Sequence, residues 1–253
     1  MGKTYVFVNQ KGGVGKTTSA LNIGAYLTEE GKKVLLVDFD SQANLSSGIG
    51  ANKPPKPGIY ELLSGKVKIE EAIRKTAIPG LDVIPASIDL SGAAVELIEQ
   101  KDRNFFLKKA LEPVKDAYNY LLIDCPPSLG ILTLNGMTAA DAVLIPMQCE
   151  YFAMEGLTLL LQTIKKIQKN LNPPLDIGGI FFTMYDPRTR LAQDVVREVS
   201  GYFKSRVFST IIPRNVRLSE APSYGLPINR YDPECSGARA YRSLAREVLT
   251  RGA

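Results

Sequence analysis

The stretch that decides the fold spans residues 10–18 and reads QKGGVGKTT. A short apolar run from Tyr5 to Val8 precedes it, and apolar residues at helical spacing follow it from Ala20 to Leu27. The sequence therefore predicts a strand, a glycine-rich loop and the first turn of a helix in direct succession. The backbone N–H groups of such a loop, together with the helix N-terminus, form a concave positive site that suits phosphate oxygens.

Two side chains of this loop carry a chemical prediction. The ammonium group of Lys16 can reach terminal phosphates, and the hydroxyl of Thr17 can bind Mg²⁺. The usual pattern has a glycine six residues before that lysine, whereas this chain has Gln10 there and a second lysine, Lys11, directly after it. The residues that we predict to bind a nucleotide here are Lys11, Gly12, Gly13, Val14, Gly15, Lys16, Thr17 and Thr18.

Composition excludes several kinds of chemistry. The chain has no histidine, so triads that contain histidine and histidine-bound metals are excluded. Its three cysteines are scattered without a CxxC pair, which indicates neither a disulfide framework nor a metal cluster held within one chain. No apolar window is long enough to span a bilayer, and the first strand begins too early to leave room for a signal peptide or an N-terminal domain. We therefore expect a cytoplasmic protein.

Strand and helix patterns alternate along the whole chain. Further strands are predicted at residues 34–37, 81–85, 120–123, 142–146, 177–184 and 207–212. Helices are predicted at residues 59–63, 69–73, 93–99, 105–118, 154–171, 191–203 and 236–251, with loops at 43–60 and 213–233. We predict one α/β domain over residues 1–253, with a single doubly wound, mostly parallel sheet and helices on both faces.

Three aspartates follow predicted strands. Asp38 and Asp40 follow the second strand, and Asp124 follows the strand at 120–123. Because ligands of such folds bind at the carboxyl ends of the strands, these side chains should lie at the same edge as the glycine-rich loop. Asp124 would join Thr17 in anchoring magnesium, and Asp40 could polarise an attacking water. Taken one at a time, each aspartate is more simply interpreted as a helix cap or a turn residue.

The second lysine and the arginines are less specific signals. Lys11 would add positive charge where phosphate charge develops. Because it stands at the front of the loop, its side chain could reach outward to a nucleotide in a facing subunit. The simpler interpretation is a solvated loop lysine. The net charge of +5 is uneven, since residues 172–253 hold 12 Lys or Arg against 8 Asp or Glu, and 11 of those cations are arginine. This skew indicates an anion-facing surface, or else ordinary solvated helix faces.

Several motifs together resemble a known family. They are KGGVGKT (11–17), DFD (38–40), IDCPPSLG (123–130), QCEY (148–151), TMYD (183–186), IPRNVRLSEAP (212–222) and YDP (231–233). In combination they resemble the deviant Walker ATPases, and among these they are similar to the short chromosome-partitioning ATPases of the ParA/Soj type. The resemblance covers nearly the whole chain.

This resemblance implies an activity and a set of site residues. Members of the family bind ATP and magnesium and form a dimer with the nucleotides sandwiched between the subunits. The resemblance implies that Lys11 contacts the partner's nucleotide and that Asp40 supports hydrolysis, so the catalytic residues would be Lys11, Lys16 and Asp40. It also implies that Pro213 and Asn215 contact the adenine.

The resemblance further implies two macromolecular partners. The ATP-bound dimer would bind double-stranded DNA without sequence preference, and a ParB-type centromere-binding protein would stimulate hydrolysis and release it. By position, the DNA-binding arginines would be Arg188 and Arg217, with Arg190 and Arg214 as further candidates. The protein would then be cytoplasmic and nucleoid-associated, with no stable membrane association.

Two departures and three alternatives accompany this interpretation. Ser41 stands where many relatives have proline, and Glu234-Cys235 stands where relatives often have Arg-Ser. The closest alternative is a MinD-like ATPase that cycles on membranes, which would need the C-terminal helix to lie in a bilayer surface; we expect that helix to dock on the core instead. The others are a nitrogenase-iron-protein-like reductase, with cysteines bridging a cluster between subunits, and a scaffold that binds ATP but hardly hydrolyses it.

Overall fold

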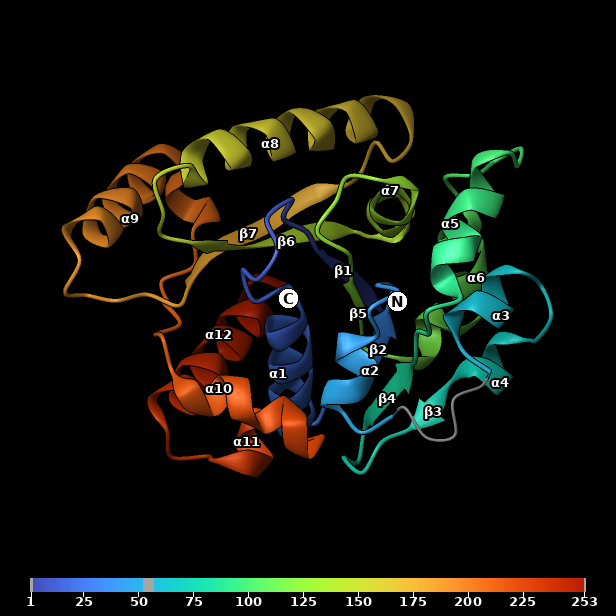
Figure 1. Ribbon diagram of the computed structural model, residues 1–253, viewed down its shortest axis with the longest axis horizontal. Helices are drawn as coiled ribbons and strands as arrows, with labels where there is room; N and C mark the ends of the chain where they lie inside the picture. Colours follow the sequence, from blue (N-terminus) through green and yellow to red (C-terminus); the bar gives the residue numbers. More distant parts are fainter. Residues whose placement is uncertain (1, 52–56, 253) are drawn as a thin grey trace.

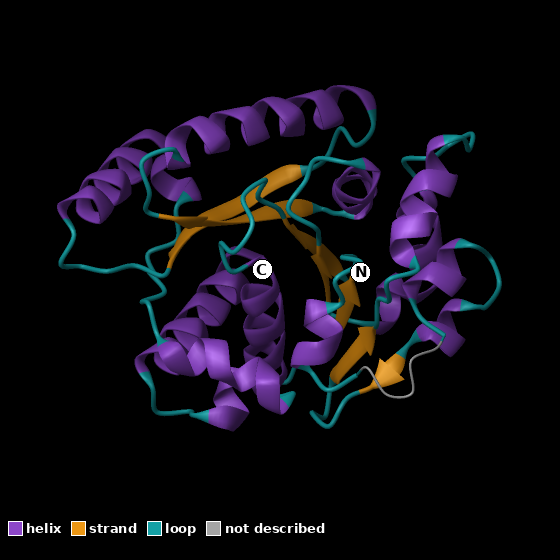
Figure 2. Cartoon of the chain, viewed as in Figure 1, coloured by secondary structure: helices purple, strands orange, loops and turns teal. Residues whose placement is uncertain are grey.

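The computed structural model describes residues 2–51 and 57–252 of the chain. Its strands are β1 (Lys3–Phe7), β2 (Val34–Asp38), β3 (Arg74–Lys75), β4 (Leu81–Ile84), β5 (Tyr120–Asp124), β6 (Ala142–Gln148) and β7 (Asp176–Thr183). They form a seven-stranded sheet in the order β3-β4-β2-β5-β1-β6-β7 (Figures 1 and 2). The described strand pairs are parallel except that of β3 with β4. The prediction of a doubly wound, mostly parallel sheet is confirmed.

The register of three neighbouring strands fixes the position of the predicted site. Phe7 at the end of β1 pairs with Asp124 at the end of β5, and Asp124 in turn pairs with Asp38 at the end of β2. These three strands therefore end in one row. The loop that follows β1 and the carboxylates that end β2 and β5 meet at the same edge of the sheet, as the sequence predicts.

Helices cover both faces of the sheet. Their bounds are α1 (Lys16–Glu29), α2 (Asn44–Gly48), α3 (Ile59–Leu63), α4 (Ile69–Ala72), α5 (Leu90–Ile98), α6 (Phe106–Leu111), α7 (Ile131–Ala139), α8 (Ala153–Asn170), α9 (Arg190–Phe203), α10 (Val216–Glu220), α11 (Ile228–Tyr231) and α12 (Ser236–Gly252). Helices α7, α8 and α9 lie on one face, and α1, α10, α11 and α12 lie on the other (Figure 1).

Each face of the sheet has its own apolar core, because successive side chains of a strand point to opposite faces. In β1, Tyr5 and Phe7 pack into the core that contains α1 and α12, whereas Val6 packs into the core that contains α7 and α8. Burial on both faces explains why these strands are apolar without interruption.

Helix α12 docks on the core, as expected. Its residues Ala238, Tyr241, Leu244, Ala245 and Val248 are all buried, and they pack in the same core as α1. The apolar face that the membrane-cycling alternative would need in a bilayer is thus covered by the protein itself. Within residues 2–51 and 57–252, none of the helices is both long and apolar enough to cross a membrane.

The predicted strand at residues 207–212 is wrong. This segment runs beside β7 without forming a regular strand; one isolated bridge joins Ile180 to Val207 at its start, and a second joins Tyr185 to Pro213 just after its end. The reason is a competing acceptor, since the N–H groups of Ser209 and Thr210 donate to the carboxylate of Glu247 on α12, over 2.8 and 2.7 Å. These two N–H groups are therefore unavailable to a sheet ladder.

Several other differences concern short elements. The predicted loop at 213–233 contains α10, α11 and the 3₁₀ turn Ala221–Tyr224, and the predicted loop at 43–60 contains α2, while its residues 52–56 lie outside the described ones. The helix predicted at 105–118 is α6 followed by the 3₁₀ turn Glu112–Ala117, which has a proline in its first turn. Helices of four or five residues are too short to show an apolar period.

We predict that truncating the buried face of α12 destabilises the fold. Leu244→Ala should lower the free energy of unfolding by about 2–5 kcal/mol, because it leaves a cavity in the core. The matched control is Leu249→Ala on the same helix, whose side chain is half-buried and should cost less. Urea denaturation measures both. Equal costs for the two variants would contradict the docked position of α12.

Candidate functional site

The glycine-rich loop takes a backbone path that needs glycine at two points. Gly13 has φ of 71° and Gly15 has φ of 87°, both in the left-handed region that residues with a Cβ atom rarely adopt. After Gly15 the chain enters α1 at Lys16. The loop therefore folds back over the end of β1 and leads into a helix N-terminus, which is the arrangement that the sequence predicts for phosphate binding.

Strands β6 and β7 hold this loop through polar side chains that belong to the QCEY and TMYD motifs but for which the sequence predicted no role. The hydroxyl of Thr183, at the end of β7, donates to the carbonyl of Val14 over 2.8 Å. The amide of Gln148, at the end of β6, donates to the carbonyl of Gly13 over 3.2 Å. Both residues end a buried strand, and a polar residue at that place is the signal that could have identified them.

Lys16 is held over the loop and is nearly buried, with 6% of its surface exposed. Its Nζ donates to the carbonyls of Asn9 and Lys11, each over 3.1 Å. Burial lowers the pKa of Lys16, and the negative charge of Asp124 opposes that shift. A charged ammonium group in this position can exchange carbonyl acceptors for phosphate oxygens at the same place.

Asp124 is the most strongly perturbed carboxylate of the site. It is 1% exposed, and its Oδ1 has no hydrogen-bond partner among the described residues. Burial raises the pKa of Asp124 well above its usual value, the nearby Asp38 raises it further, and a hydrogen bond with Thr17 acts in the opposite direction. A buried carboxylate oxygen without a partner is costly unless a cation is bound nearby.

These residues fit magnesium. Mg²⁺ is usually bound through one or two protein oxygens, with phosphates and waters completing the shell. Asp124 and Thr17 supply a carboxylate and a hydroxyl at one place. The described part of the chain holds no group of three or more Asp, Glu, Cys or His side chains that could form a cage of protein ligands alone, as zinc would need.

The segment that carries Asp40 is fixed by the buried Asp38. The Oδ2 atom of Asp38 accepts hydrogen bonds from the N–H and the hydroxyl of Ser46, over 2.8 and 2.6 Å. The hydroxyl of Ser46 also accepts from the N–H of Ala86 over 3.0 Å, and Asp40 accepts from the N–H of Gln42 over 3.0 Å. The carboxylate of Asp40 is thereby presented to the cavity above the loop. No pattern in the sequence indicated this role of Ser46.

A cavity of about 650 Å³ joins the predicted nucleotide residues. The glycine-rich loop and the start of α1 line it with Gly12, Gly13, Gly15, Lys16, Thr17 and Thr18, and the loop after β2 lines it with Asp40. Pro213 and Asn215 line it from the other side, although they lie far along the chain. Lys11 and Val14 do not line it. The volume lies within the range of small-molecule sites.

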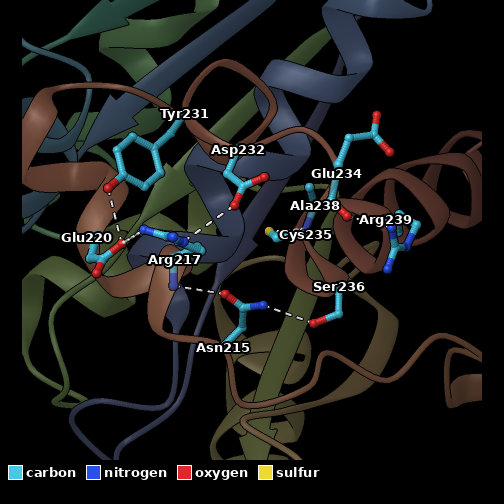
Figure 3. Close-up of polar contacts among 10 residues, drawn as sticks. All are labelled: Asn215, Arg217, Glu220, Tyr231, Asp232, Glu234, Cys235, Ser236, Ala238 and Arg239. Atoms are coloured by element: carbon cyan, nitrogen blue, oxygen red, sulfur yellow. Dashed lines mark hydrogen bonds and ion pairs between the residues drawn. The ribbon is translucent and has the colours of Figure 1, made fainter.

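Asn215 is held by two hydrogen bonds (Figure 3). Its Oδ1 accepts from the N–H of Arg217 over 2.8 Å, which caps the N-terminus of α10, and its amide donates to Oγ of Ser236 over 2.9 Å. The cap explains why a helix begins at this point of a segment predicted as a loop. The bonds also fix the part of the segment that faces the cavity.

Lys11 lies outside the cavity at the surface. Its ammonium group forms an ion pair with the carboxylate of Glu150, and both side chains are half exposed. Next to this pair, the rings of Tyr151 and Phe152 are largely exposed. In the single chain Lys11 is thus bound to its own subunit, and its contact with a partner's nucleotide stays a prediction.

The four predicted DNA-binding arginines are all exposed, and they differ in how strongly they are paired. Arg188 forms a two-pronged ion pair with Asp186, at 2.7 and 2.9 Å, which lowers the pKa of Asp186 to about 2. Arg190 lies 3.9 Å from Asp194. Arg214 lines the cavity and has no ion pair within the described residues.

Arg217 is held by two carboxylates (Figure 3). Its guanidinium lies 2.9 Å from Glu220 and 3.5 Å from Asp232, and the hydroxyl of Tyr231 donates to Glu220 over 3.1 Å. Hydrogen bonds from Arg217, then from Tyr231, lower the pKa of Glu220. A phosphate approaching Arg217 must therefore compete with ionised carboxylates, which the sequence could not reveal.

Two of the three cysteines, Cys235 and Cys125, have structural positions. Cys235 precedes α12, and its Sγ accepts from the N–H of Ala238 over 3.3 Å, so it caps the N-terminus of this helix (Figure 3). Cys125 is buried at the end of β5, and burial raises its pKa well above the usual value. A cluster bridged between two subunits requires thiolates that reach the surface, which Cys125 does not.

Residues 2–177 match a family model described as an AAA domain. The chromosome-partitioning ATPase Soj of Treponema pallidum is 64% identical over 251 residues, which cover 99% of this chain and 98% of that protein. The sporulation initiation inhibitor protein Soj of Bacillus subtilis is 52% identical over 253 residues, which cover all of both chains.

A solved structure is similar as well. Cobyrinic acid a,c-diamide synthase from Mycobacterium smegmatis, with a bound ATP analogue and magnesium, superposes with a TM-score of 0.86. It is 38% identical, and the match covers 100% of this chain and 96% of that one.

The fold and the loop define an α/β nucleotide-binding protein with a phosphate loop at the end of its first strand. Among such proteins, the chain belongs to the Soj/ParA family of chromosome-partitioning ATPases.

We predict a characteristic pH dependence from Asp38. Its pKa is raised to about 6, mainly by burial, so its neutral form is favoured in the folded protein. This contribution to stability is present below the unfolded-state pKa of about 4 and is lost as the pH rises through 6. Relative to Asp38→Asn, which stays neutral, the wild type should lose on the order of 2–3 kcal/mol of unfolding free energy between pH 4 and 7.

Urea denaturation at several pH values measures this difference. Asp186→Asn is the matched control, because the pKa of the half-buried Asp186 is lowered to about 2, so its contribution to stability is present above the unfolded-state pKa of about 4 and changes little between pH 4 and 7. If wild type and Asp38→Asn have parallel stability curves from pH 4 to 7, the buried position assigned to Asp38 is contradicted.

Proposed function

We propose that residues 1–253 form a single ATPase domain that binds ATP with Mg²⁺ and hydrolyses it to ADP and phosphate, as a DNA-partitioning protein. The observation that carries the proposal is the unpartnered oxygen of buried Asp124, next to Thr17 and within the electrostatic reach of Lys16. Thr17 and Lys16 line the cavity together with the glycines of the loop, and Asp124 lies behind them at the end of β5. The relatives named as partitioning ATPases, and the similar structure with an ATP analogue and magnesium, support it.

In this proposal each residue has a defined task. The N–H groups of the phosphate loop and the Nζ of Lys16 bind the phosphates, and Thr17 and Asp124 would hold magnesium. When bound, the metal neutralises charge that develops on the transferred phosphoryl group. Asp40, which also lines the cavity, orients and polarises the attacking water. Pro213 and Asn215 contact the adenine.

The proposal includes a dimer as the DNA-binding form. Lys11 leaves Glu150 and contacts the nucleotide of a second subunit, so that two nucleotides lie between the chains. Arg188, Arg190, Arg214 and Arg217 then contribute contacts to DNA phosphates, which give affinity without sequence readout. A ParB-type partner stimulates hydrolysis and ends the cycle. The protein acts in the cytoplasm on the nucleoid.

We predict different effects of two substitutions in the cavity. Lys16→Ala should abolish ATP binding, because the phosphate charge loses its main partner. Asp40→Ala should keep ATP binding but slow hydrolysis by about a hundredfold, because it removes only the group that polarises water. Calorimetric titration with Mg–ATP and single-turnover phosphate release measure the two steps. Retained binding in Lys16→Ala, or normal turnover in Asp40→Ala, would overturn the assigned roles.

We predict that charge reversal at Arg217 affects DNA binding specifically. Arg217→Glu should weaken ATP-dependent DNA binding by about tenfold or more and flatten its salt dependence, while the ATP-dependent dimer stays intact. The control is Arg246→Glu on α12, which changes the net charge by the same amount; Arg246 forms an ion pair with Glu30 at the end of α1. Filter binding at several salt concentrations and light scattering give the two readouts. A loss of the dimer in Arg217→Glu would show that this residue is structural.

A further inference from the structure

Helix α12 reaches the cavity at a buried tyrosine. Tyr241 lines the cavity and is 1% exposed, and its hydroxyl lies 3.0 Å from Oγ of Ser19, which is fully buried. Ser19 belongs to the first turns of α1, directly after Lys16 to Thr18. The hydroxyl pair thus links α12 to the part of α1 that faces the phosphates.

The same helix reaches the opposite wall of the cavity at its first residue. Oγ of Ser236 accepts the hydrogen bond from the amide of Asn215, and Asn215 caps α10 (Figure 3). Leu218 on α10 and Pro222 just after it continue this wall. The position of the wall opposite the phosphate loop is therefore linked to α12 as well.

The two contacts are rigidly connected. Tyr241 and Ser236 are five residues apart on one helix, which corresponds to about 7.5 Å along its axis. Between and beyond them, Ala238 and Leu244 pack in the core shared with α1. A shift of α12 would move both contacts together, because packed cores do not deform continuously.

We propose that α12 braces the nucleotide cavity at two points, with Tyr241 and Ser236 as positioning residues for nucleotide binding. Tyr241 fixes the turn of α1 that binds the phosphates, and Ser236 fixes the wall that faces the base. The proposal rests on the proposed nucleotide function of the cavity and assigns to it two residues that do not themselves bind phosphate.

The two contacts have separable consequences. Tyr241→Phe removes one hydroxyl and leaves that of Ser19 buried without its partner, so the first turns of α1 lose their fixed position. This change should weaken binding of any ligand that uses the phosphate loop. Ser236→Ala frees the amide of Asn215 at the opposite wall, so it should weaken ligands that carry a base and spare those that do not.

The experiment is a titration with a fluorescent ADP analogue in the presence of Mg²⁺, followed by its competition with unlabelled ADP and with pyrophosphate. Tyr241→Phe should weaken both competitors by about tenfold. Ser236→Ala should weaken ADP by several-fold and leave pyrophosphate unchanged. Ser19→Ala, which removes the Tyr241 contact from the other side, should reproduce the effect of Tyr241→Phe and serves if that variant does not fold.

Tyr26→Phe is the matched control. Tyr26 lies on the same helix as Ser19, about 10 Å further along it, and its buried hydroxyl has no hydrogen-bond partner among the described residues. Its loss should leave nucleotide affinity unchanged. Thermal unfolding without ligand separates a loss of stability from a loss of affinity.

Two results would overturn the brace. One is wild-type affinity for both competitors in Tyr241→Phe and Ser19→Ala, even with a lowered unfolding temperature, since the contact would then be only structural. The other is an equal loss in Tyr26→Phe. A wild type that does not bind ADP would instead contradict the proposed function itself, so the two failures are distinguishable.

Discussion

The balance of buried charge at the carboxyl edge of the sheet is the constraint on which the site depends. Asp38 and Asp124 end neighbouring strands in one row and are both fully buried, and Lys16 is the cation that faces Asp124. Burial raises the pKa of both carboxyl groups and lowers that of Lys16, which means that burial disfavours the charged form of each group. A divalent cation with phosphate oxygens would satisfy the oxygen of Asp124 and the ammonium of Lys16 at once.

The rest of the molecule maintains this edge. Parallel pairing of β2, β5 and β1 sets the row, and side chains at the ends of β6 and β7 hold the phosphate loop against it. The hydrogen bonds from Ser46 to Asp38 fix the segment that carries Asp40. On the far side of the cavity, the irregular segment after residue 212 is stabilised by a helix cap and by the ion pairs of Arg217. Stability and site geometry therefore depend on the same contacts.

The sequence predicted the sheet and the edge that carries the site better than it predicted local detail. Uninterrupted apolar runs and a loop with glycines at two left-handed positions identify the sheet and the site edge, because both depend on short-range chemistry. The missed features depend on partners far along the chain. Glu247 diverts the N–H groups of Ser209 and Thr210 from a strand, and Asp232 and Glu220 pair with Arg217. The order of residues along the chain does not show which distant acceptor lies beside a given donor in the folded protein.

The central claim is that nucleotide in this cavity controls DNA binding, and an electrophoretic shift with a long DNA duplex tests it most directly. The protein is incubated with ATP, with ADP or without nucleotide, each with Mg²⁺ and at two salt concentrations. The expected result is a shift with ATP alone, which weakens steeply at the higher salt concentration because the contacts are to phosphates. A shift of equal strength in all three nucleotide states would contradict the claim, and so would its absence with ATP at low salt.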